Sequence, residues 1–358
     1  MSRSLRFPNP GSDIPRLVNT FRVVAQAASE ANIETFDLDF MTEATVLQGQ
    51  ASSRGAVGQE ALRRSRDPNR SRDPLYNQLK MYSEVYRMLG WLRPSPDRRL
   101  NFRVSVLGEA VAEGSGFHKI ERQLLADSLL CIVFPNPNTD NVGVAAARPF
   151  RWLMLLAAEL DGMISRHEMI LGMLSVLDDR APGAFDEAAA RIRAVRGSKK
   201  LTREALDEVC HEFSVSLNTL ENYTRLPVAV LKDPTLSWGE KVRLRLKDGK
   251  THEFLKLTQA GIATAESLLT RQDVREVDLV EIGANLQSRA ALAEATHIEM
   301  MRRSGLDVSG LNEAEAQAIS DAAELLTNLG DPPVESVLYS PMQQASDNVV
   351  AEAARRYT

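Results

Sequence analysis

The chain has few cysteines and no long apolar run. Cys131 and Cys210 are the only cysteines among its 358 residues, too few for a disulfide framework and without the paired spacing of a zinc site. The longest apolar runs, such as Leu153 to Ala158, are far shorter than the ~20 residues of a membrane-spanning helix. The arginine-bearing start lacks the apolar stretch of a signal peptide. These absences predict a cytoplasmic protein with reduced thiols and no membrane partner.

Local signatures of catalysis are also missing. The sequence has no Gly-x-Ser-x-Gly, no phosphate loop and no Gly-x-Gly-x-x-Gly, and its five histidines are isolated. One constellation, Asp233 followed by Asp248-Gly249-Lys250, resembles the spacing with which many nucleases hold magnesium. Because Asp-Gly is also a preferred hairpin turn, we interpret Asp248-Gly249 as a turn. We therefore predict no catalytic or metal-binding residue and no cofactor, with Mg²⁺ needed only by a nuclease partner or a hidden nuclease site.

An excess of one charge is confined to one end. The net charge is −5, but residues 1–270 carry 36 Lys/Arg against 33 Asp/Glu, whereas residues 271–358 carry 7 against 15. A basic surface is what a nucleic-acid partner requires, and only the first part of the chain can supply one. The asymmetry predicts a body with locally basic surfaces, followed by an acidic region with a different task.

Helical spacing and one hairpin mark the first domain. Apolar residues predict a core helix and shorter helical pieces within 14–47, and an amphipathic helix over Leu75–Leu89. After Gly90 and a proline-rich turn, apolar residues alternate with polar ones from Leu100 to Val104, as in a half-buried strand. A helix, a hairpin and another helix beginning near Gly108 are in the order of a winged-helix module.

The same order returns further along the chain. Leu217, Leu220 and Tyr223 predict a short helix, and Lys241–Lys247 alternates strictly between basic and apolar residues. Asp248-Gly249 supplies the turn and the returning strand runs through Phe254–Leu257. The segments Val104–Ala110 and Leu257–Ala263 end the two hairpins alike, which we interpret as an internal duplication.

Several further helices complete the predicted fold. Phe150–Leu160 is apolar almost all round, and Ser165 with Glu168 forms a capping-box pattern that opens the next helix. We also expect helices at 188–196, 202–213, 277–301, 312–329 and 347–355. The predicted fold class is mainly α with small β-hairpin wings. Its predicted parts are an N-terminal winged-helix domain with an arginine-rich loop (1–135), a second winged-helix domain (136–270) and an acidic helical interaction region (271–358).

Polar faces of these elements nominate double-stranded DNA as the partner. In helix-turn-helix proteins the second helix reads base edges, and neighbouring elements contact phosphates. Asn and Arg suit adenine and guanine, respectively; a merely solvated face remains the alternative for each candidate. The arginine-rich loop contributes Arg54, Arg63, Arg64, Arg66, Arg70 and Arg72, and the first module contributes Asn77, Lys80, Arg87, Arg98, Arg99 and Arg103. The second module contributes Asn218, Asn222 and Arg225 on its helix and Lys241, Arg243, Arg245 and Lys247 on its wing.

Three segments carry a resemblance to a known family. The first segment is Met88–Leu92 together with the wing and Val104–Ala110, the second is Arg148–Arg166, and the third is Phe254–Gly261. They resemble the recognition half of type IIS restriction and nicking endonucleases, the FokI-like and AlwI-like groups. The resemblance covers about residues 14–270 and implies a DNA-recognition region that positions a nuclease. Those enzymes carry a nuclease domain after the recognition modules, and residues 271–358 show no equivalent.

These observations lead to one leading hypothesis and two alternatives. The chain is expected to be the sequence-recognition subunit of a restriction or anti-phage defence complex, with a separate nuclease or effector docking on 271–358. A winged-helix transcriptional regulator would use the same elements. A type IIS-like endonuclease with an unrecognised catalytic site is the third possibility, so whether this chain is itself an enzyme is left open.

Overall fold

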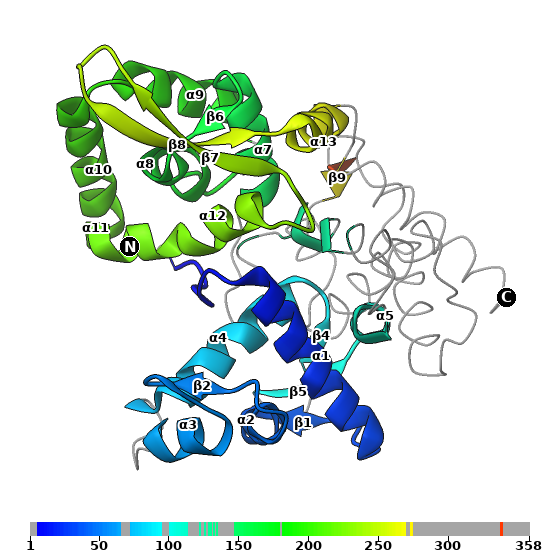
Figure 1. Ribbon diagram of the computed structural model, residues 1–358. Coiled ribbons are helices and arrows are strands. Elements are labelled where there is room, and N and C mark those ends of the chain that lie inside the picture. Colours follow the sequence, from blue (N-terminus) through cyan, green and yellow to red (C-terminus); the bar gives the residue numbers. More distant parts are fainter. Residues whose placement is uncertain are drawn as a thin grey trace, which may run out of the picture. The chain divides into compact units, whose positions relative to one another are not determined.

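The computed structural model describes residues 6–65, 72–94, 100–113, 147–179 and 181–269, isolated positions between 122 and 134, and two short strands further on. Within it the chain divides into two compact units (Figure 1). The amino-terminal unit is Pro15–Ser128 with Asn136–Val144 and Arg271–Thr358; the central unit is Ala145–Thr270 with Met1–Ile14 and Leu129–Pro135. The described parts of both units are mainly helical with small antiparallel sheets, as the sequence predicts.

The amino-terminal unit alternates helices with short strands. Its elements are α1 (Ile14–Glu30), β1 (Phe36–Asp37), α2 (Leu38–Leu47), β2 (Ser52–Ser53), β3 (Ala56–Val57), α3 (Gly58–Ser65), α4 (Pro74–Met88), β4 (Leu92–Pro94), β5 (Asn101–Val104) and α5 (Val106–Glu113). Strands β1, β5 and β4 form an antiparallel sheet in that order, and β2 pairs with β3. A separate pair joins β9 (Asp273–Val274) to β10 (Val337–Leu338).

Helix α4 begins and packs as its sequence predicts. The Asp73 side chain caps its first turn, and Pro74 occupies a position where a missing N–H costs no hydrogen bond. Tyr86, in its last turns, is fully buried; its ring lies 5.1 Å from that of Phe21 and stacks on Trp91 at 6.0 Å. Its hydroxyl donates to the carbonyl of Leu17 at 2.7 Å, and burial raises the pKa of this phenol well above its usual value. This aromatic cluster joins α1, α4 and the start of β4.

The central unit surrounds its hairpin with more helices. Its elements are α7 (Pro149–Glu159), β6 (Met163–Ile164), α8 (Arg166–Met169), which continues as the π-helical turn η2 (Ile170–Leu174), α9 (Ala184–Val195), α10 (Lys199–Phe213), α11 (Leu217–Tyr223), α12 (Arg225–Lys232), β7 (Gly239–Arg245), β8 (Thr251–Leu257) and α13 (Gln259–Leu269). Strands β6, β8 and β7 form an antiparallel sheet in that order.

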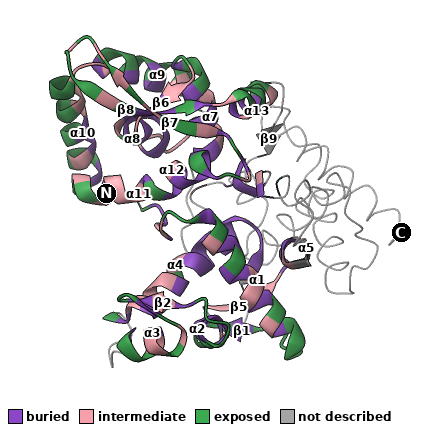
Figure 2. Cartoon of the chain, viewed as in Figure 1, coloured by how far each residue is buried: buried purple, intermediate pink, exposed green. Residues whose placement is uncertain are grey.

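Burial separates the helices of the central unit into two kinds. Helix α7 is buried along most of its length and packs against α13 and η2, as its apolar sequence predicts. Helix α10 buries only Leu206, Val209 and Phe213 and leaves its other faces largely exposed (Figure 2). A single buried stripe of this kind is typical of an amphipathic helix on the surface.

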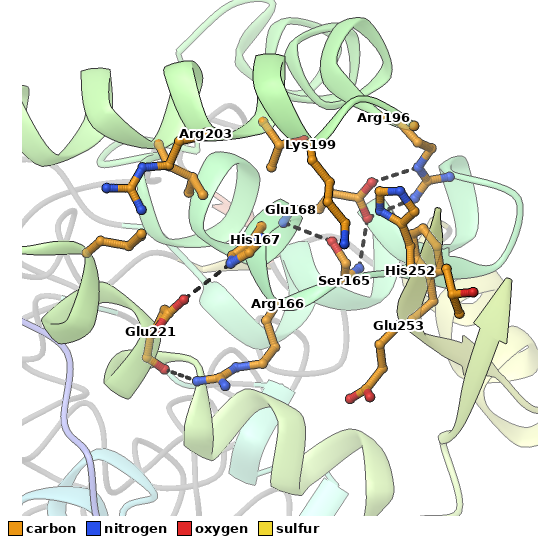
Figure 3. Close-up of a pocket in the computed structure, with 16 residues that line it drawn as sticks. Ser165, Arg166, His167, Glu168, Arg196, Lys199, Arg203, Glu221, His252 and Glu253 are labelled. Atoms are coloured by element: carbon orange, nitrogen blue, oxygen red, sulfur yellow. Dashed lines mark hydrogen bonds and ion pairs between the residues drawn. The ribbon is translucent and has the colours of Figure 1, made fainter. Parts of the chain in front are cut away.

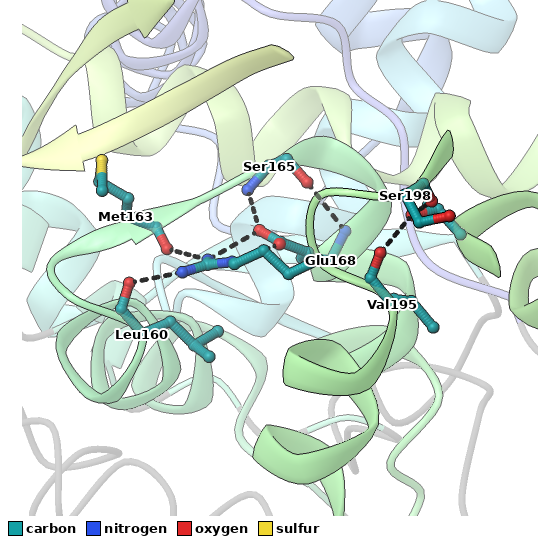
Figure 4. A network of polar contacts seen from close by, with 8 residues as sticks. Leu160, Met163, Ser165, Glu168, Val195 and Ser198 are labelled. Carbon is teal, nitrogen blue, oxygen red and sulfur yellow. Dashed lines mark hydrogen bonds and ion pairs between the residues drawn. The ribbon is translucent and has the colours of Figure 1, made fainter. Parts of the chain in front are cut away.

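The capping box predicted at Ser165 is present and is extended by an arginine. The Ser165 hydroxyl accepts from the backbone N–H of Glu168, and the Glu168 carboxylate accepts from the backbone N–H of Ser165. Arg196, at the end of α9, forms an ion pair with Glu168 at 2.7 Å and donates to the carbonyls of Leu160 and Met163 (Figure 4). The network connects α7, β6, α8 and α9.

The two units repeat one order of elements and one register. Each has a helix, a short strand, further helices, a hairpin and a closing helix, and in each sheet the short first strand pairs with the returning hairpin strand. Phe36 pairs with Phe102 in the amino-terminal unit, and Ile164 pairs with Leu255 in the central unit. The residue that follows, Asp37 or Ser165, caps the next helix in each case.

The hairpin bases repeat a more specific contact. In the amino-terminal unit the Trp91 carbonyl accepts from the backbone N–H of Ser105 at 3.1 Å, and the Ser105 hydroxyl accepts from the backbone N–H of Gly108 at 2.9 Å. A Cβ at Gly108 would overlap with the Trp91 carbonyl oxygen, so a glycine is needed there. The central unit makes the same contacts with Trp238, Thr258 and Gly261. The repeat predicted from the two strand endings is confirmed as a shared geometry.

The predicted helices at 277–301, 312–329 and 347–355 lie outside the described residues. Among the residues that the structure does describe, no helix combines the length and apolarity needed to cross a bilayer.

Candidate nucleic-acid interface

The β7–β8 hairpin of the central unit exposes the basic face that the alternation predicts. Lys241, Arg243, Arg245 and Lys247 are all exposed, whereas the apolar residues between them are half-buried. The inward face is held by packing, since Leu246 lies close to Gly197, between α9 and α10. Three of these cations, Lys241, Arg243 and Arg245, lie on the edge strand β7, and Lys247 lies in the turn that follows it.

One carboxylate on the neighbouring strand partly neutralises this positive charge. Glu253 lies opposite Arg243 in the sheet, and its carboxylate is 2.6 Å from the Lys241 ammonium and 3.8 Å from the Arg243 guanidinium. The hydrogen bond from Lys241 holds the pKa of Glu253 below its usual value, and the positive charges of Arg243 and Lys232 lower it further. Lys232, at the end of α12, was not predicted as a site residue, because nothing in its local sequence pattern places it beside the hairpin.

The turn of the β7–β8 hairpin is built as predicted. The Asp248 carboxylate accepts from the backbone N–H of Lys250 at 2.9 Å and contacts the ring of His252 at 2.9 Å. The backbone N–H of Lys199, at the start of α10, also lowers the pKa of this carboxylate. These interactions, led by the Lys250 N–H, lower the pKa of Asp248, and Gly249 has a φ of +72°, which suits a tight hairpin turn.

The nuclease-like constellation gains no support from this geometry. The Asp233 carboxylate accepts from the backbone N–H groups of Thr235 and Leu236, both at 3.0 Å, and thereby closes the turn after α12. Over the described residues, no three His, Cys, Asp or Glu side chains gather in a group that could hold a metal ion.

The helix ahead of the hairpin differs from its prediction. Asn218, Asn222 and Arg225 were expected to form one helical stripe, but α11 ends at Tyr223, and Arg225 begins α12. Between the two helices lies the buried Thr224, whose hydroxyl donates to the Glu221 carbonyl and accepts from Arg166 Nε at 2.9 Å. Asn218 and Arg225 are exposed and Asn222 is half-buried. The stripe is thus divided between two short helices.

Arg87 of the amino-terminal unit is a correction. It was predicted to contact DNA, yet it is only 7% exposed, its Nε donates to the Ser83 carbonyl, and its guanidinium lies 5.3 Å from the centre of the Phe102 ring. The helical spacing of Arg87 could not show that its side chain is buried, because the burial comes from the hairpin that folds over the end of α4. Nearer the start of α4, Lys80 is exposed and Asn77 is half-buried, so these two candidates stay accessible.

The short hairpin of this unit brings two arginines together. Arg103 of β5 is half-buried and lies directly opposite Arg93 of β4. Like charges at directly opposed positions of a sheet repel each other. The sequence pattern identified Arg103 as a candidate but not Arg93, because the position of Arg93 opposite Arg103 depends on how the two strands pair. Arg98 and Arg99 lie outside the described residues.

The arginine-rich segment, predicted as a loop, instead pairs β2 with β3 before the short helix α3. Arg54, Arg63, Arg64 and Arg72 are exposed, and Arg66 and Arg70 lie outside the described residues. Glu60 pairs with Arg63 at 2.8 Å and with Arg64 at 2.7 Å. The hydrogen bond from Arg63, followed by that from Arg64, lowers the pKa of Glu60. Two of these arginines are therefore partly neutralised within α3.

Comparison with known proteins adds no further assignment, because no protein-family model and no curated protein matches this chain.

Proposed function

We propose that this chain binds double-stranded DNA and acts as the sequence-recognition subunit of a restriction or anti-phage complex, using each unit as a winged-helix module. The element order of both units supports the winged-helix interpretation: a short strand after the first helix pairs with the returning strand of a hairpin. In the related helix-turn-helix proteins a helix enters the major groove, while phosphate contacts position the protein on the duplex.

The observation that carries the proposal is the exposed basic row Lys241, Arg243, Arg245 and Lys247. Alternate residues of a strand lie roughly 7 Å apart, so the three cations on β7 extend for about 14 Å, and Lys247 follows in the turn. Phosphates of one DNA strand recur every ~3.4 Å along the helix axis, and a row of this length can therefore follow several of them. Arg225 and Asn218, exposed on α12 and α11 of the same unit, are the candidates for base contacts.

Fluorescence anisotropy with a mixed-sequence duplex tests the proposal. Each of Arg245→Gln and Lys247→Gln is expected to weaken binding several-fold and to reduce the salt slope by ~0.9 for each phosphate that the variant no longer neutralises. Glu253→Gln should strengthen binding, because it releases Lys241 and Arg243 from their carboxylate partner. Lys200→Gln is the matched control: Lys200 is exposed on α10 and pairs only loosely with Glu204 at 3.8 Å. A chain that ignores every duplex, or variants that bind like the wild type, would contradict the proposal.

Sequence selection tests the recognition role separately. When bound fragments are sequenced from a random duplex pool, Asn218→Ala and Arg225→Ala should relax the preferred site, whereas Lys247→Gln should weaken all sites equally. Uniform losses for both classes would leave a DNA-binding protein without base readout in α11 and α12. Incubation of the full chain with plasmid and Mg²⁺ tests the endonuclease alternative directly.

Residues 271–358 are proposed as the docking region for the nuclease or effector. Their 15 acidic residues against 7 basic ones disfavour contact with phosphates and favour a basic protein surface. The expected result is salt-sensitive co-purification of a nuclease with the full chain. Loss of that partner on neutralising Asp and Glu within 271–358, with DNA binding intact, would separate the two tasks.

A further inference from the structure

The central unit contains a pocket that the DNA proposal does not use. Its volume is about 520 Å³, and it lies between α8, the first half of α10, α11 and strand β8 (Figure 3). That volume falls within the ~300–1,000 Å³ of pockets that enclose small-molecule ligands. A lone phosphate or metal ion would leave most of such a space unfilled.

Two cations at this pocket lack a carboxylate partner. The Lys199 ammonium makes no hydrogen bond or ion pair with any residue of the described structure, and Figure 3 shows it extending into the middle of the pocket. The Arg166 guanidinium donates to the Thr224 hydroxyl at 2.9 Å and to the Glu221 carbonyl, both of them neutral oxygens. Both residues therefore keep a full positive charge available to an anionic ligand.

The carboxylates around the pocket are already engaged. Glu168 is held by Arg196 and by the Ser165 N–H. Glu221 lies 3.3 Å from His167, and Glu253 lies 2.6 Å from Lys241. Because Glu168 and Glu253 each have a cationic partner, their repulsion of an incoming anion is reduced, whereas His167 offsets the charge of Glu221 only when its ring is protonated. Lys199 and Arg166 supply the positive charge that remains for the ligand.

Another part of the lining is apolar and aromatic. Leu206 and Phe254 are buried, Leu217 is half-buried, and the Phe254 ring stacks on His252 at 6.5 Å. Such a surface favours a flat ring that removes apolar area from water. The pocket thus pairs a cationic region with an apolar one.

We propose that this pocket binds a nucleoside monophosphate, with the phosphate held by Lys199 and Arg166 and the base against Leu206, Leu217 and the His252–Phe254 pair. The inference is independent of the DNA proposal, since it concerns a pocket and not the exposed basic row. Occupancy would place a small molecule beside β8, the strand that pairs with the basic strand β7, and would make the wing responsive to that molecule.

Isothermal titration of the full chain with adenosine and guanosine 5′-monophosphates tests the assignment. At least one is expected to bind, with adenosine, guanosine and inorganic phosphate each at least tenfold weaker. Lys199→Ala should weaken monophosphate binding at least tenfold. Lys200→Ala, its exposed neighbour on the same helix, should change binding less than twofold. Leu217→Ala should weaken binding of the monophosphate and leave binding of inorganic phosphate unaffected.

Measuring the affinity for duplex DNA shows whether the anion that Lys199 binds is a free ligand or a phosphate of DNA. Wild-type affinity of Lys199→Ala for duplex DNA supports a separate small-molecule pocket. Absence of binding by either monophosphate at millimolar concentration overturns the proposal, as does an equal loss in Lys199→Ala and Lys200→Ala. If the Arg245 and Lys247 variants bind duplex DNA as tightly as the wild type, the DNA proposal alone is overturned. The two outcomes are therefore distinguishable.

Discussion

The amino-terminal and central units anchor their hairpins in the same way and extend them differently. Trp91 and Trp238 accept the same backbone hydrogen bond, and a glycine without room for a Cβ packs on each. Strands β4 and β5 have three and four residues, whereas β7 and β8 have seven each. The base of the hairpin is thus a common support, and its length is where the units diverge.

At equivalent positions near the start of the two hairpins, the charged residues differ. One step beyond the first hairpin pair, the amino-terminal unit places Arg93 opposite Arg103, whereas the central unit places Glu240 opposite Lys256. The two charges of the first pair repel each other, and those of the second attract. The basic residues of the central unit are instead spread along the longer strand β7. The comparison shows that one backbone arrangement supports two different charged surfaces.

The largest expected effect tests the shared support. Gly108→Ala and Gly261→Ala should each lower the free energy of unfolding of its own unit by about 3 kcal/mol, because the new Cβ must push a tryptophan carbonyl out of a packed base. Hydrogen-exchange mass spectrometry under denaturant assigns each loss to a unit. Ala263→Ser, at an exposed position of α13, is the control with no expected change. If only one glycine variant is destabilised, the two bases are not equivalent.

A smaller effect should separate the two helix caps. Glu168→Ala removes the partner of Arg196, which is 18% exposed at its side chain, and should lower the free energy of unfolding of the central unit by about 2 kcal/mol. Asp37→Ala, at the equivalent cap of the amino-terminal unit, removes one exposed cap bond and should lower that of its unit by about 1 kcal/mol. Equal losses in urea unfolding would show that Arg196 adds nothing to the capping box.

The smallest effect concerns acid titration of the long hairpin. Asp248 has a pKa below 3.8, mainly because of the Lys250 N–H and then His252. Its contribution to folding is therefore present above pH 3.8 and is lost as the pH falls through the lower folded value. By carbon-detected NMR, His252→Ala should raise the pKa of Asp248 only partly toward the ordinary value. Glu60 of the amino-terminal unit, held by its own arginines, should titrate unchanged in that variant.

Elements with a strong local signal were predictable. The amphipathic pattern of Leu75–Leu89 corresponds to α4, the Ser165–Glu168 box is formed, and the strict alternation at 241–247 produces an exposed basic face. In each case the physical cause acts within a few residues: a helical apolar stripe, a pair of capping hydrogen bonds, or the two-residue period of a strand.

Contacts between distant segments were not predictable. Arg87 has the same helical spacing as an exposed residue, and only the folded hairpin with Phe102 buries it. Thr224, between α11 and α12, accepts a hydrogen bond from Arg166, which is far away in the sequence. The pocket at Lys199 combines four elements, none of which carries a motif by itself.

By itself, the sequence determined the main helices, their apolar faces and the similar endings of the two hairpins, because these properties depend on local spacing and capping. Only the tertiary structure decided which charges stay exposed, which carboxylates are neutralised and where a cavity remains. Those outcomes depend on packing between segments far apart in the chain, where burial and partner geometry control the electrostatic free energy.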